Sequence, residues 1–180
     1  LPVAADAEIE FCLAQRAPDG FPTTGITRTA TVKTSFTTSA DDAKFDNTGG
    51  HNAWPSDTYL NMWVVPSING GNVLGYAQFP GQDPATDGVV IAYNCFGTIP
   101  PYITPYIYGR TTIHEVGHWL NLRHVWGDGD CTEDDGLADT PDADAAHQQT
   151  CDTASNTCTE TSGPQVPDMI ENYMDYSDDR

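Results

Sequence analysis

The sequence has few basic residues and no long hydrophobic run. Its 180 residues include only 7 Lys and Arg against 26 Asp and Glu, which gives a formal net charge of -19. So acidic a chain is repelled by the phosphates of nucleic acids and by anionic membrane surfaces. No stretch approaches the ~18 consecutive apolar residues that a membrane-spanning helix needs. These absences exclude nucleic acid and membranes as partners, and they favour a solvated surface that attracts cations or cationic substrates.

Cysteine is scarce and unevenly placed. Three of the five cysteines, Cys131, Cys151 and Cys158, lie in one polar stretch near the C-terminus. Such crowding suits disulfides in an exported protein, so we expect a secreted, extracellular location. Cys12 and Cys95 lie in apolar, strand-like runs and are expected to be buried thiols. Because five is an odd number, at least one thiol has no disulfide partner within the chain.

Three histidines and one glutamate, all side chains that bind metals or transfer protons, lie in one motif, H-E-x-x-H-x-x-N-x-x-H. His114 and His118 are four residues apart, so on a helix they project from one face and can bind one metal ion at ~2 Å each. Glu115 lies beside the metal, where it can take a proton from a metal-bound water. His124 cannot share that face of a continuous helix, so the chain must turn, and Asn121 tolerates the left-handed conformation well. Three histidines with an open fourth position are typical of a catalytic zinc site.

The helix that carries the motif can be read in a second way. Thr111 or Thr112 can cap its N-terminus. If the helix were merely amphipathic, Val116, Trp119 and Leu120 would form its core face and the histidines and the glutamate would be exposed. The spacing of three histidines and one glutamate within one motif favours the metal site over this alternative.

Apolar stretches predict the strands around this helix. Residues 8–15 alternate apolar and polar side chains, as a strand does. Residues 59–65 are nearly apolar throughout, which predicts a central strand covered on both faces. A hairpin-type turn at 68–73 leads into a short returning strand at 74–79, and 88–93 predicts the next buried strand. Strands, a hairpin and one long helix indicate an α/β fold with a mixed sheet.

An acidic, glycine-containing loop follows the motif. Eight carboxylates fall within seventeen residues: Asp128, Asp130, Glu133, Asp134, Asp135, Asp139, Asp142 and Asp144. The spacing is not that of an EF-hand, but carboxylates on a glycine-rich loop are the ligands that Ca²⁺ prefers. The alternative is a solvated acidic loop. The other two histidines, His51 and His147, are expected at the surface.

Several short motifs of the sequence resemble those of the pappalysin family of metzincin zinc endopeptidases. The motif at 114–124 has Asn121 where the metzincin pattern has Gly. Residues 171–177 (E-N-Y-M-D-Y-S) resemble the Met-turn of the same clan, and G-Y-A-Q-F-P at 75–80 and H-W-L-N-L at 118–122 narrow the match to pappalysins. The resemblance extends from about Ala7 to Ser177.

The resemblance implies a fold and a set of roles. The fold would be a mixed, mostly parallel sheet with an antiparallel edge strand, an active-site helix and an irregular C-terminal subdomain stapled by a disulfide. The three histidines of the motif would bind zinc, and Glu115 would be the general base and acid. Met174 would form an apolar floor beneath the metal, and Tyr176 would stabilise the transition state.

The resemblance also implies substrate contacts. Extended protein or peptide substrates would pair with the edge strand at Gly75, Tyr76 and Ala77, because an edge strand offers unpaired backbone groups. An acidic residue near Asp178 or Asp179 would favour Arg or Lys at the cut site, since a carboxylate pairs with a basic side chain. For the edge strand and for these aspartates, an ordinary structural role is the alternative.

Two further features follow from the resemblance. Family members carry calcium near the acidic loop, and three residues are candidate ligands here: Asp128, Asp135 and Thr140. The family pattern suggests that Cys151 has its partner beyond Arg180, which leaves Cys131 to pair with Cys158.

The sequence is therefore interpreted as a single metalloprotease catalytic domain over 1–180. Residues 1–124 would form an upper sheet-and-helix part, and 125–180 a lower irregular part with the Met-turn. Residues 1–5 lack the basic start of a signal peptide, so we expect a processed or trimmed chain, with the first strand and helix of the family fold upstream. An inhibitory prosegment would also lie outside this chain.

We predict a secreted zinc-dependent endopeptidase whose zinc-bound water is activated by Glu115. The first alternative is a catalytically silent peptide-binding module structured by zinc and calcium. Loss of Glu115 or of a metal ligand would indicate such a module, and all four residues are present. The second alternative is a structural domain that binds calcium and no zinc, which metal analysis would identify.

Overall fold

A computed structural model describes residues 6–148, 152–159 and 165–178, so Cys151 lies outside the described residues. It contains a three-stranded mixed sheet and one α-helix, α1, over Arg110–Trp119. The strands are β1 (Met62–Val65), β2 (Gly75–Ala77) and β3 (Val89–Ala92). Four 3₁₀ turns complete the regular structure: Asp42–Lys44, Asp46–Thr48, Asn69–Gly71 and Tyr93–Cys95. The α/β class with a mixed sheet is as the sequence predicts.

The centre of the sheet is β3. All four of its residues are buried, as expected for a run of Val and Ile. It pairs in parallel with β1 and antiparallel with β2. The antiparallel edge strand is therefore confirmed in β2.

The prediction that 59–65 forms a central strand is wrong. Strand β1 begins only at Met62 and lies at the other edge of the sheet, in the order β1-β3-β2. Met62 and Val64 are 40% and 47% exposed, so only one face of β1 is covered. The predicted hairpin is reduced to one antiparallel bridge between Ile68 and Val73, because β1 and β2 both pair with β3 and not with each other. The turn at Asn69–Gly71 is real, but the strands that it connects lie on opposite sides of β3.

Residues 8–15 do not form a strand in the described structure. Their alternating apolar side chains Ile9, Phe11 and Leu13 are 54–61% exposed. A strand requires a ladder of hydrogen bonds to a neighbour, and here the Gln15 carbonyl, at the end of the stretch, accepts the Thr23 N–H at 3.0 Å without such a ladder. Cys12, expected to be buried, is exposed for the same reason, whereas Cys95 is buried as predicted.

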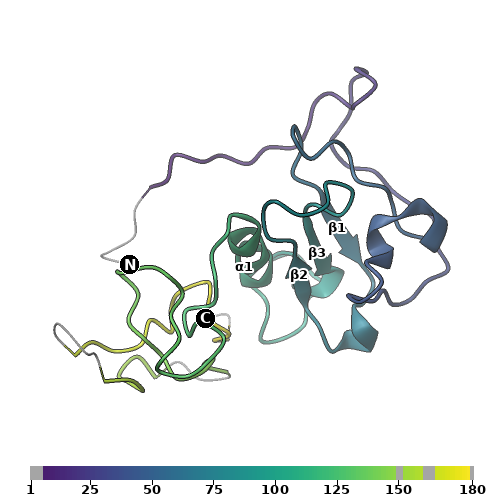
Figure 1. The fold of residues 1–180 in the computed structure, drawn as a ribbon. Helices are drawn as coiled ribbons and strands as arrows, with labels where there is room; N and C mark the ends of the chain where they lie inside the picture. The colour runs from purple at the N-terminus through teal and green to yellow at the C-terminus, as the bar shows by residue number, and fades with distance from the viewer. Residues whose placement is uncertain (1–5, 149–151, 160–164, 179–180) are drawn as a thin grey trace.

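One face of the sheet covers the larger core. Trp63, Val65 and Val90 pack there with Phe36 and Ile68. The opposite face lies against α1, which contacts β2 and β3. One side of the helix thus packs against β2 and β3, and its other side faces the C-terminal part of the chain (Figure 1).

Helix α1 begins at Arg110, two or three residues earlier than a cap at Thr111 or Thr112 would place it. Its N-cap is Gly109, at φ 73°, which a glycine adopts at little cost. Neither Thr111 nor Thr112 is the cap: both lie in the first turn, and Thr112 Oγ1 donates to the Phe96 carbonyl at 2.9 Å. The helix ends at Trp119, and the chain reverses at Asn121, whose φ of 75° is in the left-handed region that the sequence predicts for it.

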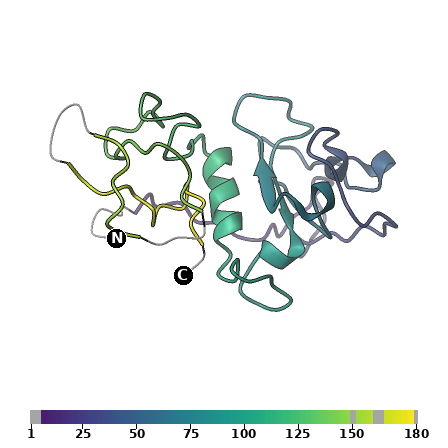
Figure 2. The ribbon, with the colours of Figure 1, turned by 90° about the horizontal axis from the view of Figure 1, so that it is seen from below.

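The C-terminal part is irregular and lies on the far side of α1 from the sheet (Figure 2). After α1, the described residues contain no helix or strand. A second small core there joins Val125, Trp126, Ala143 and Met174. Cys131 and Cys158 form the predicted disulfide. Among the described residues, no helix has the length and hydrophobicity to cross a membrane.

Removing this disulfide is expected to destabilise the fold by ~3.5 kcal/mol. The bond closes a loop across a sequence separation of 27 residues, and loop-closure entropy for that length predicts this loss in the free energy of unfolding. Urea unfolding of a Cys131→Ser, Cys158→Ser double variant would measure it. A Cys12→Ser variant is the control, because that thiol is exposed. Equal stability of the double variant and the parent chain would contradict the prediction.

Candidate active site

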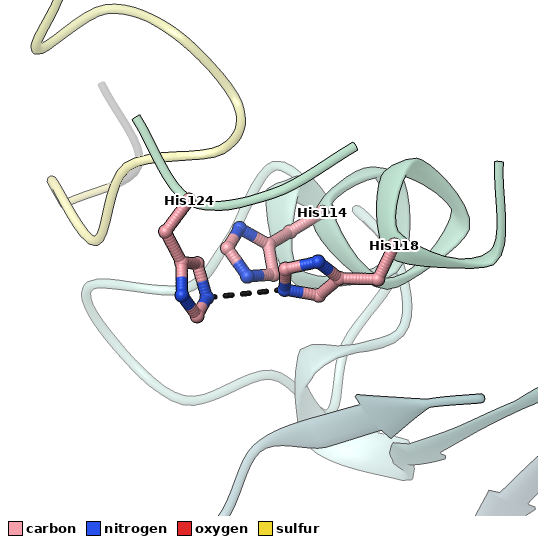
Figure 3. Close-up of side chains that lie close together, drawn as sticks. All are labelled: His114, His118 and His124. Carbon is pink, nitrogen blue, oxygen red and sulfur yellow. Dashed lines mark hydrogen bonds between the residues drawn. The ribbon is translucent and has the colours of Figure 1, made fainter. Parts of the chain in front are cut away.

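The three histidines of the motif converge on one point (Figure 3). His114 and His118 come from successive turns of α1, and His124 is brought back by the turn at Asn121. One nitrogen from each ring lies within 4.8 Å of the others. The Nε2 atoms of His118 and His124 are 3.0 Å apart. The helix period and one left-handed residue are therefore sufficient to assemble the cluster.

Every Nδ1 in the cluster is already engaged. His114 Nδ1 donates to the Tyr173 carbonyl at 2.7 Å, and His118 Nδ1 donates to the Leu122 carbonyl at 2.8 Å. His124 Nδ1 contacts the Asp128 carboxylate. These bonds place the proton on Nδ1 and leave the Nε2 lone pairs facing each other. Lone pairs 3.0 Å apart repel unless a cation lies between them, so this donor set fits zinc, which prefers imidazole nitrogen.

Burial also favours the neutral form of the two histidines on α1. It lowers the pKa of His114 to about 4, partly opposed by the bond to Tyr173. Burial also lowers the pKa of His118. Both rings are therefore neutral near pH 7, which is the form that binds a metal.

Asp128 contacts His124 directly, a contact that the sequence does not predict. Its side chain is 63% exposed, and it has a φ of 64°. A carboxylate on the far nitrogen fixes the orientation and tautomer of a ligating histidine. The one feature of the sequence that could have indicated this contact is the four-residue spacing of His124 and Asp128, and that spacing indicates a contact only within a helix.

Changing Asp128 to Asn is expected to weaken zinc binding by about 10- to 100-fold, the usual cost of removing such a partner. Competition with a chelator of known affinity would measure the change. Asp130→Asn is the matched control, because Asp130 is exposed and bonds only within its own turn to Thr132. The predicted role fails if both variants retain zinc equally well.

Glu115 lies next to the histidine cluster and against the outer strand. It is 6% exposed, and burial raises its pKa to about 8 in the metal-free chain. Gly75 of β2 faces it closely: a Cβ built on Gly75 would lie 2.8 Å from Glu115 Cγ. The lack of a side chain at Gly75 lets the edge of the sheet approach the carboxylate. Glu115 is therefore close to any peptide that pairs with β2.

Met174 packs closely against α1 at Gly117. The residue is 4% exposed, and a Cβ on Gly117 would lie 2.3 Å from the Met174 sulfur. Val125 N–H donates to the Met174 carbonyl at 3.3 Å. The methionine thus packs against α1 at Gly117, which lies between His114 and His118 in the sequence, as an apolar floor would.

The ring of Tyr176 lies at the side of the cluster. Its centroid is 5.4 Å from that of His114, 4.9 Å from that of His124 and 4.9 Å from that of Trp126. Burial raises the pKa of the phenol, and the carboxylates of Glu115 and Asp128 raise it further. The phenol therefore keeps its proton at neutral pH and can donate a hydrogen bond beside the metal.

The structure brings two of the three candidate calcium ligands, Asp135 and Thr140, into contact. Asp135 is buried, and its carboxylate accepts the Leu137 N–H at 2.8 Å and a side-chain bond from Thr140. Asp128 contacts His124 instead. Of the two aspartates considered for substrate specificity, Asp178 is half-buried, and Asp179 lies outside the described residues.

The prediction that His147 is a surface residue is wrong. Its side chain is only 11% exposed and lies between the buried carboxylates of Asp168 and Asp175. His51 is half-exposed and contacts Asp46. Nothing local in the sequence indicated the environment of His147, because its partners are brought to it by the irregular fold.

Taken together, these features define a metzincin-type metalloprotease site: two histidines and a glutamate on one helix, a third histidine after a sharp turn, and a methionine below them. The family model described as Pregnancy-associated plasma protein-A matches residues 43–180. The chain belongs to this family, the pappalysins.

Curated relatives and solved structures are also similar to this chain. An extracellular metalloprotease of Arthroderma otae is 37% identical over 140 residues, covering 73% of this chain and 45% of that protein. One of Pyricularia oryzae is 39% identical over 127 residues, covering 67% and 41%. Mature mirolysin of Tannerella forsythia, solved in complex with a cleaved peptide, matches with a TM-score of 0.87 at 44% identity, covering 98% of this chain and 66% of that one. The chain thus spans less than half the length of these two curated relatives.

Proposed function

We propose that this chain is the catalytic part of a secreted zinc endopeptidase. The observation that supports this most strongly is the convergence of three Nε2 atoms beside a buried glutamate. The curated relatives are named extracellular metalloproteases, which supports secretion. A silent binding module would be expected to lack part of this constellation.

The residues of the site have separate tasks. Bound zinc would supply a Lewis acid that lowers the pKa of a water molecule to ~7 and polarises the scissile carbonyl. Glu115 accepts the proton of the attacking water and passes it to the leaving amine. Tyr176 donates its phenolic proton in a hydrogen bond to the developing oxyanion. Its place beside His114 and His124 supports this task.

The substrate would bind as an extended peptide along β2. In the described part of the chain, the sheet ends at β2, whose outer edge can therefore accept another strand. Antiparallel pairing at Gly75, Tyr76 and Ala77 would bring the scissile bond past Glu115, which Gly75 contacts. Mirolysin was solved with a cleaved peptide, in keeping with this mode of use. An upstream prosegment, as the name promirolysin indicates for a neighbour, would keep the enzyme latent.

A preference for basic residues is the finer part of the proposal. The formal net charge of -19 favours cationic peptides, and Asp178 or Asp179 would pair with Arg or Lys at the cut site. Cleavage of a mixed peptide library, read by mass spectrometry with and without a zinc chelator, tests both parts. Chelator-sensitive cutting next to Arg or Lys supports them. Cutting without that pattern removes the preference alone, and zinc binding without cutting favours the peptide-binding module.

We also propose a structural calcium ion in the acidic loop, bound at Asp135 and Thr140. The contact between these two side chains and the burial of Asp135 support it. With Ca²⁺ bound, the melting temperature is expected to rise in the parent chain and not in Asp135→Asn. Asp139→Asn, at an exposed carboxylate in the same loop, is the control. An equal rise in Asp135→Asn would place the ion elsewhere.

A further inference from the structure

His147 is held between two carboxylates in the interior of the C-terminal part. Its Nε2 is 3.1 Å from Asp168 Oδ2, and its Nδ1 is 3.0 Å from Asp175 Oδ2. The two carboxylate side chains are 1% and 0% exposed. Each ring nitrogen therefore has a carboxylate oxygen, a hydrogen-bond acceptor, within hydrogen-bond distance. The three residues form a buried charged cluster, called here the His147 cluster.

The two carboxylates lie in the same C-terminal segment, but they bond to different parts of the chain. Asp168 accepts the Thr157 Oγ1 hydroxyl at 2.9 Å and the Thr157 N–H at 3.2 Å, next to the disulfide at Cys158. Asp175 accepts two backbone N–H groups, from His147 at 3.0 Å and from Tyr176 at 2.8 Å. The imidazole therefore connects the disulfide-bonded loop to the segment that forms the floor of the active site.

Asp175 occupies a critical place in that segment. It lies between Met174, which packs against Gly117, and Tyr176, whose ring contacts the histidine cluster. Two residues earlier, the Tyr173 carbonyl accepts the bond from His114 Nδ1. Burial raises the pKa of Asp175, and the contacts with His147 oppose that rise. Without His147, the Asp175 carboxylate would be buried with no cationic partner in the cluster, at a cost that favours rearrangement of the turn.

We propose that His147 is a positioning residue for the active site. Acting through Asp175, it holds residues 173–176 so that the Tyr173 carbonyl orients His114 and the Tyr176 phenol faces the metal. Histidine is suited to this position because its two ring nitrogens contact two carboxylates on opposite sides of the ring. This inference rests on the proposed zinc endopeptidase function.

The test compares His147→Gln with His51→Gln. Both substitutions remove a histidine that contacts an aspartate, but His51 is far from the floor of the site in sequence and contacts Asp46. His147→Gln is expected to lower kcat by about 10- to 100-fold, the usual effect of losing an outer-shell partner. KM should change by less than about threefold, since β2 is untouched, and one zinc should stay bound per chain. His51→Gln should match the parent in all three.

A second readout needs no turnover. Cobalt in place of zinc gives a visible absorption spectrum that depends on ligand geometry, and His147→Gln should shift its bands while His51→Gln should not. If His147→Gln does not fold, Asp175→Asn, which keeps the size of the side chain, takes its place with the same expectations. Unchanged kcat and unchanged cobalt bands, with only a lower melting temperature, would overturn the inference and leave His147 a structural residue. An inactive parent chain would instead count against the proposed function, and the cobalt bands would still decide the role of His147.

Discussion

Replacing Glu115 with Gln is expected to lower kcat by about 10²- to 10⁴-fold, the range that a general base contributes. Gln has the shape of Glu and cannot accept the proton of the attacking water. The neighbouring contact with Gly75 is close, with Glu115 Oε1 3.0 Å from a Cβ built there. An isosteric substitution therefore changes the chemistry while the edge of the sheet stays in place.

The measurement is kcat on a peptide taken from the library cuts, with zinc per chain determined by atomic emission on the same sample. Zinc should remain at one per chain, because Glu115 is not among the three nitrogen donors. Glu10→Gln is the control, since Glu10 is exposed. Substantial turnover by Glu115→Gln with zinc bound would remove Glu115 from the role of base.

Removal of the metal is expected to abolish activity and to destabilise the chain. The three imidazoles would then face one another with no cation between them, with the Nε2 atoms of His118 and His124 3.0 Å apart. By mass action, free zinc at 100 times its dissociation constant stabilises the folded state by about 2.7 kcal/mol. Dialysis against a chelator, followed by activity and urea unfolding, measures both effects. Zinc added back should restore them.

His124→Ala provides the matched variant for this experiment. It leaves α1 and its two histidines intact, and it removes the donor that the turn at Asn121 delivers. Zinc should fail to restore its activity or its stability. Activity in a chain shown to contain no metal would contradict the zinc mechanism as a whole.

The active-site motif could be predicted from the sequence because its geometry is local. The helix period places His114 and His118 on one face, and Asn121 adopts the left-handed turn that brings in His124. The burial of residues 89–92 followed from their composition in the same way. Both predictions depend on contacts close together in the chain or on hydrophobicity alone.

The order of the strands and the surroundings of His147 could not be predicted in this way. An apolar run at 59–65 predicts burial but does not say which neighbour covers each face, and Met62 and Val64 remain exposed at the edge. Residues 8–15 have the strand period, but in the described structure no neighbouring strand pairs with them. His147 and Asp175 are 28 residues apart in a segment without periodicity, so only the fold brings them together.

The hydrogen bond from His114 to the Tyr173 carbonyl crosses 59 residues of sequence, although the three donor nitrogens all lie within one short motif. Affinity for the metal and alignment of the metal are thus encoded in different parts of the gene. A single proteolytic cut in the acidic loop beyond Asp128 is expected to leave the three donors in place and to disturb the bond to Tyr173, which would give a chain that retains zinc but has little activity. Metal content alone is therefore expected to be a poor measure of the integrity of this active site.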